Sequence, residues 1–311
     1  MTQARRPLEF DIAGSGSLGS FFASILTHSG HSVRLLSRNP KTKAITLTLE
    51  GVPGAVTPWI TPNLVRTPLS EWEPSPSRTL ILATKAGPGA DLLQRLQNSP
   101  TLLPPIWVAC NGLGLFDGLD SGRFSAGLYR ILCGFGVKEI TPGRYQFIGP
   151  GSAEWASFSS PLLESSEILD ALSQLGTQRR PIPSVREAEW RKLAWNAPMN
   201  APLALEGRLN GELPKSPELL ERFDRILNEC VQVALAEGID LNPDGHLRNR
   251  LLAAIEITAS NLNSMAADVL RGRPTEIDWI NGAIAKKALK HGLKAPENER
   301  ISAEIRKLST H

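Results

Sequence analysis

The stretch Leu8-Glu9-Phe10-Asp11-Ile12-Ala13-Gly14-Ser15-Gly16-Ser17-Leu18-Gly19 decides the fold of this chain of 311 residues. Its first six residues form a short apolar run that is typical of a buried strand. Residues 18–28 then place Phe21, Phe22, Ile25 and Leu26 on one face of a helix. The glycines between these elements have the pattern GxGxxG. In such a turn the first permits a tight bend, the second lets a ligand approach the backbone, and the third allows close helix–strand packing.

A loop of this kind leads into the first turn of a helix, where unpaired N–H groups and the helix dipole favour an anion. A glycine turn without a ligand is the alternative, but a strand before it and a helix after it are what a dinucleotide site requires. The sequence therefore predicts that a dinucleotide pyrophosphate is held by Gly14, Ser15, Gly16, Ser17, Leu18 and Gly19.

The remainder of the first half alternates between strand and helix patterns. Further strands are predicted over residues 32–36, 46–49, 56–60, 80–84 and 106–110, and a helix over 90–97. This alternation is typical of a parallel sheet covered by helices. Residues 52–77 are rich in proline and predict short edge strands and turns, because proline cannot donate a hydrogen bond to a sheet ladder.

From about Ser184 the strand patterns disappear. Helical patterns follow over residues 184–206, 216–237, 246–271 and 277–291. The residues Arg179–Pro183, which include two prolines, mark the change. The predicted fold class is an α/β Rossmann-type dinucleotide-binding domain over residues 1–181, followed by an all-α domain over residues 182–311.

Composition excludes several classes of protein. The 34 Lys and Arg residues against 31 Asp and Glu give a formal net charge of only +3, and the basic residues are scattered, so no nucleic-acid partner is expected. No run of residues is long and apolar enough to predict a membrane span, and residues 8–13 carry two acids, unlike a signal peptide. The expected partner is a small-molecule substrate, and a homodimer is left open.

The chain has three cysteines and five histidines, and none of them has the spacing of a metal site. We therefore predict no metal, and reduced cysteines in a cytoplasmic protein. Cys110 follows an apolar strand and has no histidine near it in sequence. It is either a nucleophile or a small buried side chain, and the pattern favours the second.

The type of dinucleotide is predicted from the end of the second strand. A site for NAD places an Asp or Glu there, which holds the 2′-hydroxyl of the ribose. This chain instead has Ser37 and Arg38 and no acid, a combination suited to a 2′-phosphate. The sequence therefore favours NADPH/NADP+ over NADH.

In the second half, Lys192, Asn196 and Asn200 are spaced at four residues and so share one face of the predicted helix. A solvated polar stripe is one interpretation. The other is a functional face, because Trp190, Leu193 and Trp195 suggest that the helix is largely buried. The spacing by itself leaves both open.

The chain resembles the ketopantoate reductases (2-dehydropantoate 2-reductases) over essentially its whole length. The resemblance rests on these motifs in order: Gly14-Ser15-Gly16-Ser17-Leu18-Gly19, Ala83-Thr84-Lys85-Ala86, Cys110-Asn111-Gly112-Leu113-Gly114, Trp190-Arg191-Lys192-Leu193-Ala194-Trp195-Asn196, Asn210-Gly211-Glu212-Leu213, Ser264-Met265, Thr275-Glu276-Ile277-Asp278-Trp279-Ile280-Asn281-Gly282, His291-Gly292 and Pro296-Glu297-Asn298. Of these, the last block, from Ser264 to Asn298, is the most specific.

The resemblance implies NADPH-dependent reduction of the ketone of a 2-oxo acid, the pantoate step on the route to pantothenate and coenzyme A. It implies that Lys192 is the general acid and that Glu276 orients the substrate hydroxyl. It also implies that Ser264 binds the substrate carboxylate. Further hydrogen bonds to substrate or nicotinamide would come from Asn111, Asn196, Asn200 and Asn210, and Lys85 and Arg38 would lie on the cofactor side. Two residues have a second implied role: the catalytic Glu276 and the substrate-binding Asn111 would also bind the cofactor.

One departure concerns the helix of Lys192. The family usually has a proline directly after the second asparagine, whereas here Pro198 and Pro202 stand on either side of Asn200. Because proline bends a helix, the position of Asn200 and the identity of the substrate depend on this departure. A reductase of another bulky 2-oxo acid and a non-catalytic NADP(H)-binding sensor are the alternatives.

Overall fold

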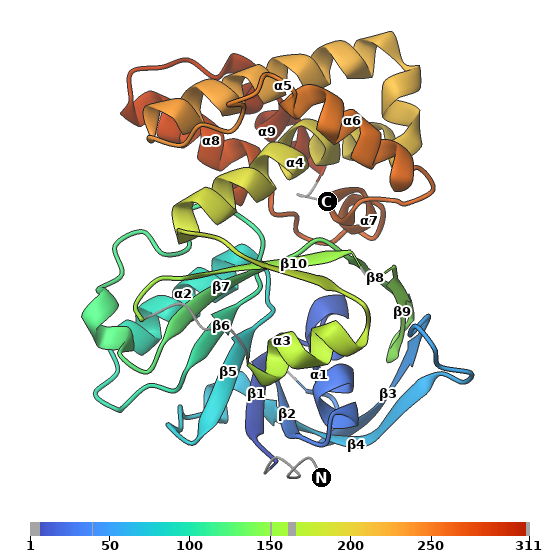
Figure 1. The fold of residues 1–311 in the computed structure, drawn as a ribbon, viewed down its shortest axis with the longest axis vertical. Coiled ribbons are helices and arrows are strands. Elements are labelled where there is room, and N and C mark those ends of the chain that lie inside the picture. The colour runs from blue at the N-terminus through green and yellow to red at the C-terminus, as the bar shows by residue number, and fades with distance from the viewer. Residues whose placement is uncertain (1–6, 39, 150, 161–165, 309–311) are drawn as a thin grey trace. The chain divides into compact units, whose positions relative to one another are not determined.

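The computed structural model describes residues 7–38, 40–149, 151–160 and 166–308 (Figure 1). The chain divides into two compact units. We call the first the α/β unit, which contains Met1–Cys110 and Phe116–Ala188, and the second the helical unit, which contains Asn111–Leu115 and Glu189–His311. The short segment 111–115 thus belongs with residues that follow it much later in the chain.

The described part of the α/β unit holds one sheet of eleven strands, in the order β11-β10-β7-β6-β5-β1-β2-β4-β3-β9-β8. The strands are β1 (Glu9–Ala13), β2 (Ser32–Ser37), β3 (Ala44–Glu50), β4 (Trp59–Pro68), β5 (Arg78–Leu82), β6 (Ile106–Val108), β7 (Leu128–Cys133), β8 (Gly136–Thr141), β9 (Arg144–Ile148), β10 (Ser152–Ser157) and β11 (Gln178–Pro181). The helices are α1 (Ser17–His28), α2 (Ala86–Gln97) and α3 (Glu167–Gln174), with 3-10 turns η1 (Leu69–Glu71) and η2 (Ser121–Phe124).

Six neighbouring strands are parallel and define the fold class. Their order is β4-β2-β1-β5-β6-β7, which is 3-2-1-4-5-6 when the six are numbered along the chain. This is the order of a doubly wound dinucleotide-binding sheet, and the direction of winding reverses between β1 and β5. The predicted Rossmann-type α/β fold is confirmed, as is the helical region that follows it.

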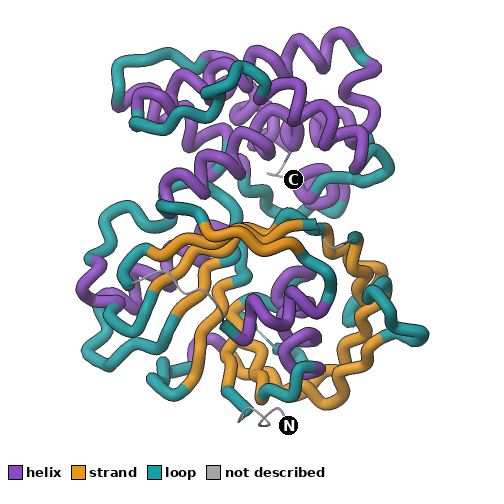
Figure 2. Tube along the Cα trace, in the orientation of Figure 1, coloured by secondary structure: helices purple, strands orange, loops and turns teal. Residues whose placement is uncertain are grey.

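Helix α1 lies in the hollow of the curved sheet (Figures 1 and 2). It contacts β1, β2 and β4 on one side and β8 and β9 on the other. Phe21 shows why, because its ring stacks on Phe147 and lies against Phe135. Since α1 is covered on both sides, eight consecutive residues from Gly19 to Leu26 are buried.

Strand β4 corrects the prediction for the proline-rich segment. The strand predicted over 56–60 begins only at Trp59, runs to Pro68, and lies inside the sheet between β2 and β3 rather than at an edge. Pro62 is tolerated because it lies in a β-bulge, where the pairing with β3 passes from Thr61 directly to Leu64. Asn63, at φ 53°, completes the bulge.

The described helical unit contains six α-helices and two 3-10 turns. They are α4 (Val185–Glu206, whose first four residues belong to the α/β unit), η3 (Asn210–Lys215), α5 (Pro217–Ala236), α6 (Leu247–Ile257), α7 (Ser264–Leu270), η4 (Ile277–Trp279), α8 (Asn281–Lys290) and α9 (Pro296–Leu308). Their apolar faces meet in one core that includes Trp190, Phe223, Ile255, Ile284 and Ile301.

Two of the predicted helices are each divided in the structure. The helix predicted over 246–271 is broken by residues 258–263, because the side chain of Asn263 caps a new helix by accepting from the N–H of Ala266. The helix predicted over 277–291 is a 3-10 turn followed by α8, and the break lies at Ile280. Both breaks lie beside residues of the candidate site.

Candidate active site

Each glycine in the loop after β1 has a different structural role. Gly14 has φ +117°, and a Cβ atom there would lie 2.4 Å from the carbonyl oxygen of Ala83. A Cβ at Gly19 would lie 1.9 Å from the carbonyl oxygen of Gly14, so only glycine lets α1 start against β1. At Gly16 a Cβ would meet nothing within 4 Å. The loop therefore leaves open space in front of the N-terminus of α1, as a bound pyrophosphate requires.

The next strand of the sheet adds Lys85 at the same edge. Lys85 follows β5, which pairs with β1 in parallel, and it is the exposed residue before the first turn of α2. Since β1 and β5 are the strands between which the winding reverses, their carboxyl ends flank the crevice in which sheets of this type bind ligands. The structure thus brings Lys85 to the same end of the sheet as the glycine loop.

At the end of β2, Ser37 is buried and Arg38 is exposed. A third residue lies beside them that the sequence did not identify. Nη2 of Arg66, in β4, lies 3.5 Å from Oγ of Ser37. Arg66 stands 28 residues after Arg38, and only the pairing of β2 with β4 brings it close, so the sequence offered no signal for it.

The polar face of α4 is present in the helical unit. Asn196 and Asn200 are 6% and 4% exposed, and among the described residues their side-chain amides have no hydrogen-bond partner. Lys192, one turn before Asn196, is half-buried. The two residues are buried overall, but their unpaired amide atoms still reach the surface, so they can form hydrogen bonds to a ligand.

Asn111 and Glu276 meet within the helical unit. Nδ2 of Asn111 donates to Oε2 of Glu276 at 3.0 Å, and the Glu276 carboxylate is only 6% exposed. The segment of Asn111 is fixed at two further points, where the N–H of Leu113 donates to the carbonyl of Trp279 and that of Gly114 donates to the Glu189 carboxylate.

Asn210 and Ser264 are linked through the loop that breaks the predicted helix. Asn210 donates through its backbone to the carbonyl of Asn261 and through Nδ2 to Oγ1 of Thr258. Its Oδ1 is buried, with no hydrogen-bond partner among the described residues. Ser264 opens α7 at the end of the same loop and is exposed. Asn210 therefore holds the loop that presents the Ser264 hydroxyl.

A buried amide network ties the segment after Glu276 to α4. Asn281 is fully buried, and its Nδ2 donates to the carbonyl of Ala197 at 3.1 Å and to Oδ1 of Asn298 at 3.0 Å. Asn298 in turn donates to Oε2 of Glu229 through both its backbone N–H and its side chain. Since Ala197 directly follows Asn196, this network fixes the stretch of α4 between Asn196 and Asn200. The helix continues through both Pro198 and Pro202.

The cysteines fit structural roles. All three are free thiols, and Cys110 and Cys230 are buried. Burial raises the pKa of Cys230 to about 12, so it does not ionise near neutrality. Sγ of Cys110 lies 3.5 Å from the carbonyl oxygen of Leu82, in the space that a side chain at position 89 would occupy.

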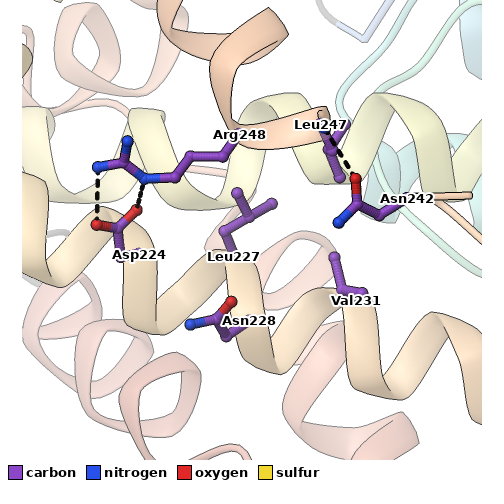
Figure 3. A pocket seen from close by; sticks show the side chains of 7 residues that line it. All are labelled: Asp224, Leu227, Asn228, Val231, Asn242, Leu247 and Arg248. Atoms are coloured by element: carbon purple, nitrogen blue, oxygen red, sulfur yellow. Dashed lines mark hydrogen bonds and ion pairs between the residues drawn. The ribbon is translucent and has the colours of Figure 1, made fainter. Parts of the chain in front are cut away.

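One hollow in the described helical unit lies away from these residues. It has a volume of about 310 Å³ and lies at α5 and α6 (Figure 3). Leu227, Val231 and Leu247 line it, and Arg248 makes a two-bond ion pair with Asp224 at its rim. It contains none of the predicted site residues, and its charged groups neutralise each other.

The described residues contain neither a candidate metal centre nor a candidate membrane span. No group of three or more His, Cys, Asp or Glu side chains is arranged to hold a metal ion. In the same part of the chain, every helix is too short or too polar to cross a bilayer.

Comparisons with known proteins agree on one family. The family model described as ketopantoate reductase PanE/ApbA matches residues 10–160, and the model of its C-terminal part matches residues 184–309. The 2-dehydropantoate 2-reductase of Vibrio cholerae is 29% identical over 301 residues, which cover 96% of either chain.

Solved structures share the fold. A D-mandelate dehydrogenase with NADH superposes with a TM-score of 0.79 at 22% identity, covering 97% of this chain and 99% of the other. A dimeric ketopantoate reductase from Staphylococcus aureus superposes with a TM-score of 0.72 at 18% identity, covering 97% and 99%.

Proposed function

The chain belongs to the ketopantoate reductase family, and we propose that it reduces the ketone of 2-dehydropantoate (ketopantoate) to pantoate with NADPH. The observation that carries this proposal is the polar face of α4. Two nearly buried amides, Asn196 and Asn200, lack partners among the described residues and follow Lys192 at helical spacing. The resemblance of the curated relatives along almost the whole chain supports it.

The α/β unit would hold the cofactor. The positive φ of Gly14, the open space at Gly16 and the exposed N-terminus of α1 fit a pyrophosphate, and Lys85 offers a cation at the same edge. Ser37 and Arg38 would bind the 2′-phosphate, since no acid stands at the end of β2 to hold a free 2′-hydroxyl. When bound, the nicotinamide supplies the hydride.

Lys192 would be the general acid. Hydride addition to a ketone carbon builds negative charge on the oxygen, so a positioned cation that also donates a proton stabilises the transition state. The ammonium of Lys192 can do both. The neutral amides of Asn196 and Asn200 can donate hydrogen bonds to substrate oxygens without competing for that proton.

Glu276 and Asn111 would select the substrate. With Nδ2 of Asn111 on one carboxylate oxygen, the Glu276 side chain is held in one orientation, and it can accept a hydrogen bond from the substrate hydroxyl. A buried site that binds a hydroxyl rejects analogues without it, because its polar groups are then left unpaired. Ser264 would bind the substrate carboxylate, and Asn210 would hold its loop.

The experiment is a steady-state measurement of kcat/KM with NADPH over a panel of 2-oxo acids. Ketopantoate should have the highest value. A higher value for a different bulky 2-oxo acid would assign the chain to that substrate. NADPH binding without turnover of any member would identify a non-catalytic sensor.

The proposal also covers the oligomeric state and the cellular location of the protein. We expect a cytoplasmic homodimer, by analogy with the dimeric enzyme of Staphylococcus aureus. Light scattering coupled to size-exclusion chromatography measures the mass, which is 33.8 kDa for one chain.

A further inference from the structure

Arg66 and Ser37 project from the same face of the sheet. In the parallel pairing of β2 with β4, Leu35 lies opposite Arg66 and Ser37 lies opposite Pro68. Paired residues and alternate residues of a strand share a face, so Arg66 and Ser37 are on the face of Leu35, which packs in the core around α1. The glycine loop opens α1 on this same face.

The charge of Arg66 is not neutralised by a carboxylate among the described residues. Its Nη2 contacts the Ser37 hydroxyl, and its Nε is buried without a hydrogen-bond partner. The arginines on the opposite face of the sheet differ, because Arg34 and Arg78 both form ion pairs with the buried Asp11. The face of Arg34 and Arg78 thus has a carboxylate that pairs with its cations, whereas Arg66 has none on its own face among the described residues.

A half-buried cation without an anion is costly, so a ligand of opposite charge would be stabilised beside Arg66. The position of Arg66 identifies the kind of ligand. Ser37 occupies the site where an NAD-binding protein places the acid for the ribose 2′-hydroxyl, and a guanidinium beside it can bind a phosphate through two N–H groups.

We propose that Arg66 is a second cationic contact to the 2′-phosphate of NADPH, and that Arg66 and Arg38 together give the preference over NADH. This inference rests on the proposed cofactor. It does not rest on the identity of the 2-oxo acid. In this arrangement Arg38 supplies an exposed charge and Arg66 a half-buried one fixed by its strand.

The test is equilibrium binding of NADPH and NADH, followed by quenching of tryptophan fluorescence, in the wild type and in Arg66→Gln. We expect the variant to bind NADPH about tenfold or more weakly, the scale of a lost hydrogen bond to a charged group. NADH affinity should stay within about twofold, which also reports that the variant is folded. The matched control is Arg95→Gln, at an exposed position of α2, which should change neither affinity.

Adenosine 2′-phosphate and adenosine 5′-phosphate separate the phosphate contact from the rest of the cofactor. Only the first should bind Arg66→Gln more weakly than wild type. Should Arg66→Gln fail to fold, Arg66→Met keeps the packed stem of the side chain and is measured in its place. Equal losses for NADPH and NADH, or no loss for either, would overturn the inference.

Failure of the proposed function gives a different result. A chain that loses NADPH selectivity with Arg66→Gln but does not reduce ketopantoate keeps this inference and loses the substrate. A chain that reduces ketopantoate with unchanged selectivity in the variant keeps the substrate and loses this inference.

Discussion

Nδ2 of Asn111 donates to Oε2 of Glu276 across 165 positions of sequence. A carboxylate held in this way, at 6% exposure, has only limited freedom to turn. The alternative, purely structural role for an acid at this position is to complement a helix dipole. The structure weakens that reading, because Glu276 precedes a 3-10 turn of three residues and α8 begins only at Asn281.

Glu276→Gln should therefore affect kinetics more than stability. The amide oxygen can still accept from Asn111, but the negative charge is gone. We expect kcat/KM for ketopantoate to fall by about tenfold or more, since a hydrogen bond to a charged group is worth ~1.5–3 kcal/mol. The loss should be much smaller for 2-oxoisovalerate, which lacks the hydroxyl. Equal losses on both substrates would remove Glu276 from substrate selection. Glu299→Gln, at an exposed position in the first turn of α9, is the control.

Lys192→Ala tests the general acid. We expect kcat to fall by ~10²–10⁴-fold, the usual contribution of a positioned acid. The dissociation constant of NADPH should stay near that of wild type. Arg191→Ala, the exposed neighbour on α4, controls for a general effect on the helix. A normal kcat in the Lys192 variant would contradict the assignment.

Two glycines of the loop should respond in opposite ways. Gly16→Ala meets open space at φ −81°, so the free energy of unfolding should change by less than ~0.5 kcal/mol. NADPH should bind about tenfold or more weakly, because the methyl group would lie in the path of the proposed pyrophosphate. Gly19→Ala meets the Gly14 carbonyl and should destabilise the fold. Chemical denaturation and NADPH titration measure both variants. A Gly16 variant that binds NADPH normally would place the cofactor elsewhere.

Asp11 predicts how stability depends on pH. Burial alone would raise the pKa of this carboxyl, but hydrogen bonds from Arg34 and Trp72 and the charges of Arg78 and Arg34 lower it below its ordinary value of 3.8. A lowered folded-state pKa stabilises the fold above the unfolded value, and the contribution disappears as pH falls through the folded value. Asp11→Asn should cost about 3 kcal/mol at pH 7, because Arg34 loses its acid and Arg78 keeps only its ion pair with the exposed Glu9.

The measurement is the free energy of unfolding of wild type and Asp11→Asn between pH 3 and 7. The difference should be constant near neutrality and shrink below about pH 4. Asp244→Asn, which removes an exposed partner of Arg250, is the control and should have a far smaller effect. A difference that grows on acidification would contradict the predicted sign.

Asn281→Ala should release α4 at Ala197. We expect a loss of ~1–3 kcal/mol in stability, since Ala197 and Asn298 each lose a buried hydrogen bond. KM for ketopantoate should rise about tenfold, because small displacements of positioning groups weaken substrate binding, with NADPH affinity unchanged. Ser302→Ala removes another buried bond of the same network, to the Asn298 carbonyl, without touching α4. If both variants lose stability but keep a normal KM for ketopantoate, Asn281 does not position the substrate-binding face of α4.

The sequence predicted the elements with strong local patterns. β1, α1 and β2 each lie within two residues of their predicted ends, because apolar periodicity and the glycine loop define them locally. Strands β7 to β11 and helix α3 were not predicted. β11 shows the reason, since all four of its residues are exposed and only pairing with β10 makes it a strand.

The candidate site divides in the same way. Lys192, Asn196 and Asn200 could be placed on one face because a helix fixes their spacing. The contact of Asn111 with Glu276, the tie of Asn281 to Ala197 and the approach of Arg66 to Ser37 join residues distant in sequence. No local pattern encodes such contacts, which depend on how strands pair and helices pack.

The assignment of residues 111–115 to the helical unit has a consequence for biosynthesis. Gly114 bonds to Glu189 and Asn111 to Glu276, partners translated 75 and 165 residues later. At ~5–20 residues per second, Asn111 waits about 10–30 s on the ribosome before Glu276 is made. A fragment beginning at Glu189 would also lack Leu113, whose side chain is buried in the core of the helical unit. The two units therefore cannot be separated by a single cut in the gene, and a helical fragment would need the pentapeptide supplied in trans.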